Sequence, residues 1–193
     1  MNRGDVVRAF AELRGDAVVV MGPGGSSGLL WQAHPHPATI YNMELAYATP
    51  VALGIALGAP ERRVLSFEGD GSLFAATPVL GTIARYPPAN LSVIVLANGI
   101  WGTGDASIAT TPHATRWPDL AVACGWNSQR VVIADALGPF RDAVRRSLSE
   151  SGPWFICAVT ERSSQDASGN RARPSVDAVE TADLLRRYLA EKR

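Results

Sequence analysis

Hydrophobic positions follow two alternating spacings along the chain, one typical of helices and one typical of strands. Val6, Phe10 and Leu13 recur at helical spacing and predict a helix over residues 3–14, before an apolar strand at 17–21. The alternation predicts an α/β fold, an open parallel sheet with helices on both faces. We expect the remaining strands at 63–67, 91–97, 130–133 and 154–159, and the remaining helices at 29–31, 44–58, 73–83, 119–124, 137–148 and 177–191.

Two of these segments have unusual compositions. Residues 91–97 form a continuous apolar run rich in β-branched side chains, which is typical of a central parallel strand covered on both faces. Residues 44–58 are nearly all small or aliphatic and contain neither Asp nor Lys. This composition predicts a helix that is buried on several faces, and it also suits close packing against a partner domain.

Composition and charge narrow the class of protein. The 193 residues are 47% hydrophobic, and 18 basic side chains balance 18 acidic ones, so no net field draws the chain to nucleic acid or an anionic membrane. The apolar runs are shorter than the roughly 20 residues that span a bilayer. Two cysteines are too few for a disulfide framework or an iron–sulfur cluster. We expect a cytoplasmic protein with no nucleic-acid or membrane partner, built as one domain over residues 1–162 followed by a linker and C-terminal helix over 163–193.

Polar residues gather directly after three of the predicted strands, where ligands bind in open parallel sheets. The sequence 68–72 (Glu-Gly-Asp-Gly-Ser) follows one strand, Asn98 follows another, and a glycine-rich turn at 22–28 follows a third. If the two strands before Asp70 and Asn98 are neighbours, both side chains can bind one hard cation, Mg²⁺ or Ca²⁺, through oxygen. The anion that such a metal bridges is most simply a diphosphate.

The sequence Gly69-Asp70-Gly71-Ser72, followed after 26 residues by Asn98, resembles the cofactor motif of thiamine-diphosphate-dependent enzymes. The resemblance implies that Asp70, Asn98 and the Ile100 carbonyl bind Mg²⁺. It also implies that the metal holds the diphosphate of the cofactor. The family usually carries two successive Asn residues where this chain has Ala97 and Asn98, but the second of them is the metal ligand.

The same resemblance extends upstream to the segment 43–50. It implies that Leu45 props thiamine diphosphate into its bent form and that the Met43 carbonyl accepts a hydrogen bond from the pyrimidine amine. The bent form brings that amine close to the reactive carbon, so that a proton transfer becomes intramolecular. Gly24 and Ser27, in the glycine-rich turn, resemble the loop that touches the diphosphate or the substrate.

The resemblance covers residues 1–160, one pyrophosphate-binding domain. Full members of the family also need a pyrimidine-binding domain that supplies an activating Glu, and no second copy of the α/β pattern is evident. The chain is therefore similar to the separate small subunit of split 2-oxo acid decarboxylases, such as sulfopyruvate decarboxylase and related phosphonopyruvate decarboxylases. The resemblance implies a pyrimidine-binding partner chain, in a heterodimer or heterotetramer, and a small 2-oxo acid substrate. Two alternatives stay open: a split carboligase of the acetolactate synthase type, and a non-catalytic cofactor domain that regulates a partner.

One histidine is a candidate catalytic residue. His113 lies in the long loop after the metal-binding segment, where a proton donor or a partner for the substrate carboxylate would be useful. The residues around it, 109–113, depart from the continuation that the split decarboxylases usually carry. His34 and His36 flank prolines and are expected at the surface or at a subunit contact.

Overall fold

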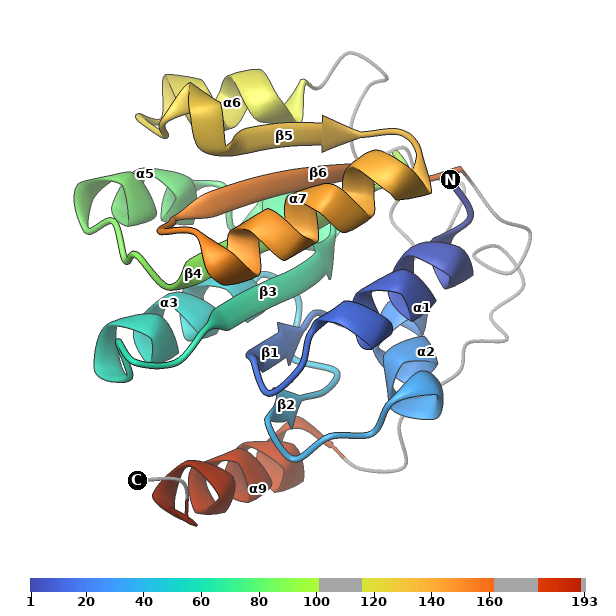
Figure 1. Cartoon of the computed structure of the whole chain (residues 1–193), viewed down its shortest axis with the longest axis vertical. Helices are drawn as coiled ribbons and strands as arrows, with labels where there is room; N and C mark the ends of the chain where they lie inside the picture. Colours follow the sequence, from blue (N-terminus) through green and yellow to red (C-terminus); the bar gives the residue numbers. More distant parts are fainter. Residues whose placement is uncertain (101–115, 162–176, 192–193) are drawn as a thin grey trace.

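Six parallel strands form a single sheet in this computed structural model, which describes residues 1–100, 116–161 and 177–191 (Figure 1). The strand order is β2-β1-β3-β4-β6-β5, so β3 and β4 lie side by side at the centre. The predicted α/β fold is confirmed. The strands are β1 (Val18–Met21), β2 (Thr39–Ile40), β3 (Val64–Gly69), β4 (Leu91–Ala97), β5 (Val131–Ala134) and β6 (Trp154–Val159).

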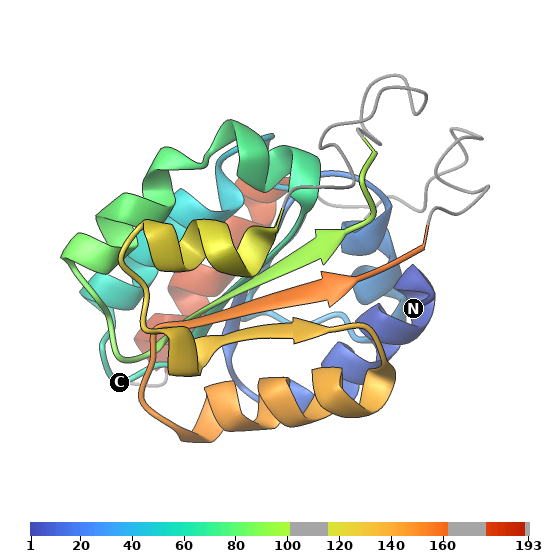
Figure 2. The same ribbon diagram turned by 90° about the horizontal axis from the view of Figure 1, so that it is seen from above.

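Helices cover both faces of the sheet, and a separate apolar cluster fills the space on each face (Figure 2). One cluster contains Phe10, Leu30 and Phe140, and the other contains Leu53, Leu80 and Leu185. Helices α1 (Arg3–Leu13), α2 (Gly25–Ala33) and α7 (Leu137–Ser149) contribute to the first cluster, and α3 (Ala48–Gly58), α4 (Asp70–Ala75), α5 (Pro78–Arg85), α6 (Trp117–Ala123) and α9 (Ala178–Glu191) contribute to the second.

The central strand behaves as its sequence predicts. Strand β4 lies between β3 and β6, and its residues from Leu91 to Leu96 are all buried. Every position along a strand that is covered on both faces must be apolar or have its polar atoms paired, which is why the run 91–97 shows no alternation. Among the described residues, no helix is long and apolar enough to cross a membrane.

The main differences from the expected elements are one additional strand, two later or earlier helix starts and one divided helix. Strand β2 was not predicted, and α2 already begins at Gly25, so most of the glycine-rich turn is helical. The expected helix over 73–83 is two helices, because Pro78 starts α5 and cannot continue the hydrogen-bond ladder of α4. The expected helix over 44–58 begins only at Ala48, since residues 45–47 form a separate turn before it.

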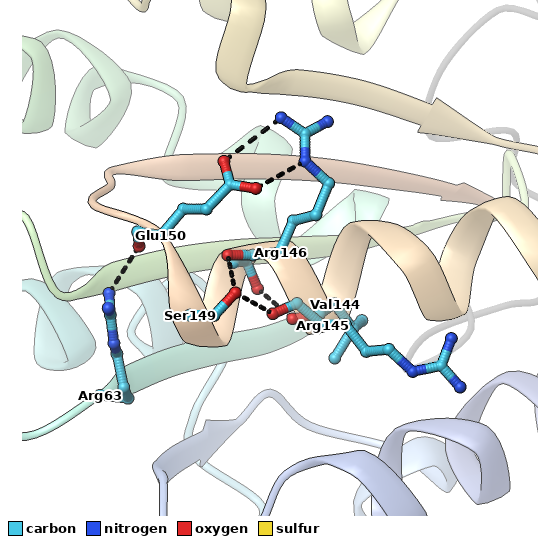
Figure 3. A network of polar contacts seen from close by, with 7 residues as sticks. Arg63, Val144, Arg145, Arg146, Ser149 and Glu150 are labelled. Atoms are coloured by element: carbon cyan, nitrogen blue, oxygen red, sulfur yellow. Dashed lines mark hydrogen bonds and ion pairs between the residues drawn. The ribbon is translucent and has the colours of Figure 1, made fainter.

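Arginine side chains tie the elements together at the amino ends of the strands (Figure 3). In the last turn of α7, the Arg146 guanidinium pairs with the Glu150 carboxylate at 2.9 Å and lies 4.7 Å from the centre of the Trp154 ring. Arg63, which directly precedes β3, donates to the Glu150 carbonyl at 2.8 Å. These contacts lie opposite the edge where the candidate cofactor residues are found.

Candidate functional site

Asp70 and Asn98 follow two neighbouring strands, as the sequence interpretation requires. The register of β3 and β4 aligns Gly69 with Leu96, so Asp70 and Asn98 emerge together from the carboxyl edge of the sheet. The Asp70 carboxylate accepts a hydrogen bond from the Gly99 N–H at 2.7 Å, which links the two strand ends directly. The condition on which the predicted metal site depended is therefore met.

The Asp70 carboxyl group is held in a dry, rigid setting. The residue is 1% exposed, and its second carboxylate oxygen accepts from the Gly71 N–H at 2.8 Å. Burial raises the pKa of Asp70 from 3.8 to about 6, and the hydrogen bonds from backbone amides oppose this rise without cancelling it. A carboxylate in this setting has a strong electrostatic need for a nearby positive charge.

The residues at this edge fit a divalent cation. Within the described part of the chain, no Lys, Arg or His forms an ion pair with Asp70, so a bound cation would supply the missing counter-charge. The Asn98 side-chain oxygen, half-buried beside it, accepts from the Ile100 N–H at 3.0 Å, and among residues 1–100, 116–161 and 177–191 no other donor to it is found, which leaves a second lone pair. Carboxylate, amide and carbonyl oxygens are the ligands that Mg²⁺ takes in proteins.

The segment 42–47 forms a tight turn beside the metal residues. The Met43 N–H donates to the Met21 carbonyl at 2.9 Å, and the Ala46 N–H donates to the Ser72 hydroxyl at 3.0 Å. Ala46 has a φ of 73°, in the left-handed region that a residue with a side chain seldom adopts. The turn is therefore fastened to β1 on one side and to α4 on the other, and it carries the half-buried Leu45 between them.

The start of helix α2 completes the carboxyl edge around β1. Gly24, with a φ of 96°, adopts a conformation that favours glycine, and its N–H donates to the Asn42 side-chain oxygen at 3.4 Å. The Ser27 hydroxyl is fully buried and accepts from the Asn42 N–H at 2.7 Å. Ser27 thus joins α2 to the turn at 42–47.

The structure brings most of the predicted site residues to one edge of the sheet. Three groups of elements carry them: β3 and α4, the end of β4, and the turn with the start of α2. His113 lies outside the described residues, as does the segment 109–113 around it. Gathered at this edge are Gly69, Asp70, Gly71, Ser72, Asn98, Ile100, Met43, Leu45, Gly24 and Ser27.

Sequence reasoning gave no role to Glu68, which is a second buried carboxyl group at this edge. Glu68 is 1% exposed and accepts hydrogen bonds from the Thr49 N–H at 3.2 Å and from the hydroxyls of Thr49 and Ser72. Burial raises the pKa of Glu68, and these hydrogen bonds oppose the rise. The available signal was the strand pattern, because Ser66 and Glu68 place two polar side chains on the same face of a strand that is otherwise apolar.

Most of the chain matches a known protein family and known relatives. A family model described as the thiamine pyrophosphate enzyme, C-terminal TPP binding domain, matches residues 24–158. A phosphonopyruvate decarboxylase of Streptomyces viridochromogenes is 32% identical over 183 residues, which cover 94% of this chain and 44% of that protein. The beta subunit of a sulfopyruvate decarboxylase of Methanococcus maripaludis is 27% identical over 187 residues, which cover 96% of this chain and 91% of the subunit.

A solved structure shows the same fold. The thiamine diphosphate-dependent 4-hydroxybenzoylformate decarboxylase of Rhodococcus jostii RHA1 matches with a TM-score of 0.72 and 22% identity, over 84% of this chain and 33% of that chain. The chain thus spans less than half the length of the phosphonopyruvate decarboxylase but nearly the whole of the sulfopyruvate decarboxylase beta subunit.

Proposed function

Because this chain belongs to the thiamine pyrophosphate enzyme family and carries its C-terminal TPP binding domain, we propose that it is the thiamine-diphosphate- and Mg²⁺-binding subunit of a two-chain 2-oxo acid decarboxylase. Its relatives include phosphonopyruvate and sulfopyruvate decarboxylases, so 3-phosphono- and 3-sulfo-substituted pyruvates are the first substrates to test. When bound, thiamine diphosphate supplies the electron sink that makes loss of CO₂ from a 2-oxo acid feasible. Residues 1–162 form the proposed cofactor-binding domain.

One observation carries the proposal. Asp70 and Asn98 leave neighbouring strands side by side, and the Asp70 carboxylate is buried without a cationic partner among the described residues. In this proposal Asp70, Asn98 and the Ile100 carbonyl bind Mg²⁺, which fixes the diphosphate. The turn that carries Met43 and Leu45 orients the other end of the cofactor, and Gly24 and Ser27 border the diphosphate.

The outward face of helix α3 supports a partner chain. Four residues lie on this face at helical spacing: Pro50, Gly54, Leu57 and Gly58. None of them has a polar side chain, although a solvent-facing helix stripe is normally polar. Leu57 is 53% exposed in the chain alone. We assign this face to a pyrimidine-binding partner, which would supply the activating Glu and the length that this chain lacks relative to the phosphonopyruvate decarboxylase.

A substitution at Gly54 tests partner binding separately from the stability of the chain. Within the described residues, no atom lies within 4 Å of a Cβ built at Gly54, so Gly54→Ala meets no obstacle in the chain itself. Alanine favours helix by about 1 kcal/mol, so we expect the variant to be more stable to urea yet to bind the partner more weakly in sedimentation experiments. Gly81→Ala is the matched control, because Gly81 is an equally open glycine within α5. Equal partner affinity in both variants would contradict the assignment of this face.

The proposal is tested on the protein purified from its own host, with whatever copurifies. Native mass spectrometry should show a second chain together with masses for thiamine diphosphate and Mg²⁺.

The complex should release CO₂ and an aldehyde from one member of a series of 2-oxo acids, and Asp70→Ala should abolish this activity. Turnover that requires an added aldehyde or ketone would indicate a carboligase instead. Activity that Asp70→Ala leaves unchanged would indicate a non-catalytic domain. If the decarboxylase is active, His113→Asn tests the proposed proton donor.

A further inference from the structure

Glu68 is a buried ionisable group at the candidate site with no place in the proposed metal site. It lies in β3 two residues before Asp70, on the face of the sheet that α3 covers. Gly22, at the end of β1, lies so close that a Cβ at this position would be 2.6 Å from the Glu68 Cβ. Glycine at position 22 therefore lets β1 and β3 approach closely beside Glu68.

The Glu68 carboxylate lies at the centre of a hydrogen-bond network. The Ala46 N–H donates to the Ser72 hydroxyl at 3.0 Å, and that hydroxyl then donates to one carboxylate oxygen. The Thr49 N–H and hydroxyl both donate to the other oxygen. The Thr49 hydroxyl also lies 2.9 Å from the Ser66 hydroxyl, which extends the network along β3. The two carboxylate oxygens of Glu68 thus accept from donors on two different elements, α3 and α4.

The two arms of the network end on different elements. The Thr49 arm reaches the start of helix α3, where the N-cap residue Tyr47 makes no capping side-chain hydrogen bond within the described residues. The Glu68 carboxylate takes over this role, because it satisfies a first-turn amide and places negative charge at the helix N-terminus. The Ser72 arm reaches Ala46, whose φ of 73° needs outside support. Glu68 thus holds the turn at 42–47 to helix α4, which begins with Asp70.

We propose that Glu68 is a positioning residue that fixes the spacing between the turn at 42–47 and the metal-binding turn at Asp70. This inference rests on the proposed function, since it assigns the two turns to opposite ends of one cofactor. Glu68 itself touches neither metal nor cofactor. Its carboxylate acts through Ser72 and Ala46, and the loss of this link would free the turn while leaving Asp70 and Asn98 in place.

Two ligands that share only the diphosphate separate this role from a general structural one. The protein purified from its host is titrated, at saturating Mg²⁺, with thiamine diphosphate and with inorganic pyrophosphate. Glu68→Gln keeps the size of the side chain but replaces an acceptor by a donor that faces the Ser72 hydroxyl. We expect the variant to bind thiamine diphosphate about tenfold more weakly and pyrophosphate with unchanged affinity. Asp70→Asn should weaken both. If Glu68→Gln weakens both ligands equally, or neither, the inference is wrong.

Amide hydrogen exchange tests the link without any ligand. In the cofactor-free protein, the Ala46 amide should be protected, and both Glu68→Gln and Ser72→Ala should reduce this protection. Thr49→Val removes the hydroxyl bond to Glu68 but keeps the Thr49 N–H donor and the whole Ser72 arm, so it should leave the Ala46 protection in place. Unchanged Ala46 protection in Glu68→Gln or Ser72→Ala would overturn the inference. If the wild-type protein binds neither ligand, the proposed function fails, and the exchange data still decide whether Glu68 holds the turn.

Discussion

The carboxyl and amino edges of the sheet differ in the side-chain groups that bind the backbone. At the carboxyl edge, side-chain oxygens accept from backbone N–H groups: Asp70 accepts from Gly99, and Glu68 accepts from Thr49. At the amino edge, side-chain N–H groups donate to backbone carbonyls: the buried Arg14 donates to Ala38 at 3.2 Å and to Ala17. Arg63, Arg130 and Asn90 at the same edge also donate to backbone carbonyls.

This contrast follows from the direction of the chain. In a parallel sheet with helical crossovers, helices begin at the carboxyl edge with unpaired N–H groups and end at the amino edge with unpaired carbonyls. Acceptors therefore suit the first edge and donors the second. The amino edge uses cations of its own, whereas Asp70 at the carboxyl edge has no cationic partner among the described residues. The buried carboxylate of Asp70 is therefore suited to a cationic ligand, whereas the cations of the amino edge bind backbone carbonyls of the chain itself.

The largest expected effect comes from removing the charge of Asp70. We expect Asp70→Asn to weaken Mg²⁺-dependent binding of thiamine diphosphate by at least about 100-fold in calorimetric titrations. The stability of the metal-free protein should not fall in proportion to this loss of affinity. A pKa raised from 3.8 to about 6 means that burial of the ionised group disfavours folding at pH 7 by about 3 kcal/mol, and the variant removes this term. The variant also turns its NH2 group toward the Gly71 or Gly99 N–H and loses that hydrogen bond, so the two effects oppose each other and the free energy of unfolding of the metal-free variant should change by less than about 3 kcal/mol. Asp135→Asn, at an exposed residue directly after β5, should leave binding unchanged.

The opposite result is expected at the amino edge. Arg14 is 1% exposed, and burial lowers its pKa to about 10, so it stays charged at neutral pH. Arg14→Met leaves buried carbonyls unpaired and should lower the free energy of unfolding by about 3 kcal/mol in urea titrations. The affinity of the folded fraction for thiamine diphosphate should be unchanged. Arg8→Met, at an exposed arginine of α1, serves as the control, and a loss of affinity in Arg14→Met would break the comparison between the edges.

The alkylation rates of the two cysteines test the same comparison between the edges, with a smaller expected effect. Burial, together with the nearby Asp70 carboxylate, raises the pKa of the Cys157 thiol to about 12, whereas Cys124 is partly exposed. At pH 8 only about one Cys157 thiol in 10,000 is ionised, so iodoacetamide should alkylate Cys124 first, as peptide mass mapping would show. Arg14→Met should speed the labelling of Cys157 by populating unfolded molecules, and Asp70→Asn should not. Equal labelling rates for both thiols in the wild-type protein would contradict the burial of Cys157.

The smallest effect is expected for the exposed ion pair in Figure 3. Arg146 and Glu150 are both well exposed, and solvent screens their interaction. Arg146→Lys keeps the charge but loses the two-point contact with Glu150, and we expect its thermal melt to coincide with that of the wild type. A clear fall in the melting temperature would mean that the packing of Arg146 over Trp154 matters more than its charge.

Much of the site could be predicted because it depends on local sequence. An apolar run followed by Gly69-Asp70-Gly71 places the carboxylate at a strand end whatever the rest of the fold does. Pro78 was an available but unused signal for the break between α4 and α5. Strand β2, by contrast, has only two residues, too few for any hydrophobic period to be recognised.

The sequence by itself determined five of the six strands, the central position of β4, and the strand-end placement of Asp70 and Asn98, because backbone periodicity and turn chemistry act over a few residues. Only the tertiary structure decided that β3 and β4 are neighbours, that Glu68 joins Thr49 to Ser72, and that Arg14 is buried. These features join residues that are distant in sequence. Their energies come from desolvation and paired hydrogen bonds, which exist only once the chain has folded around them.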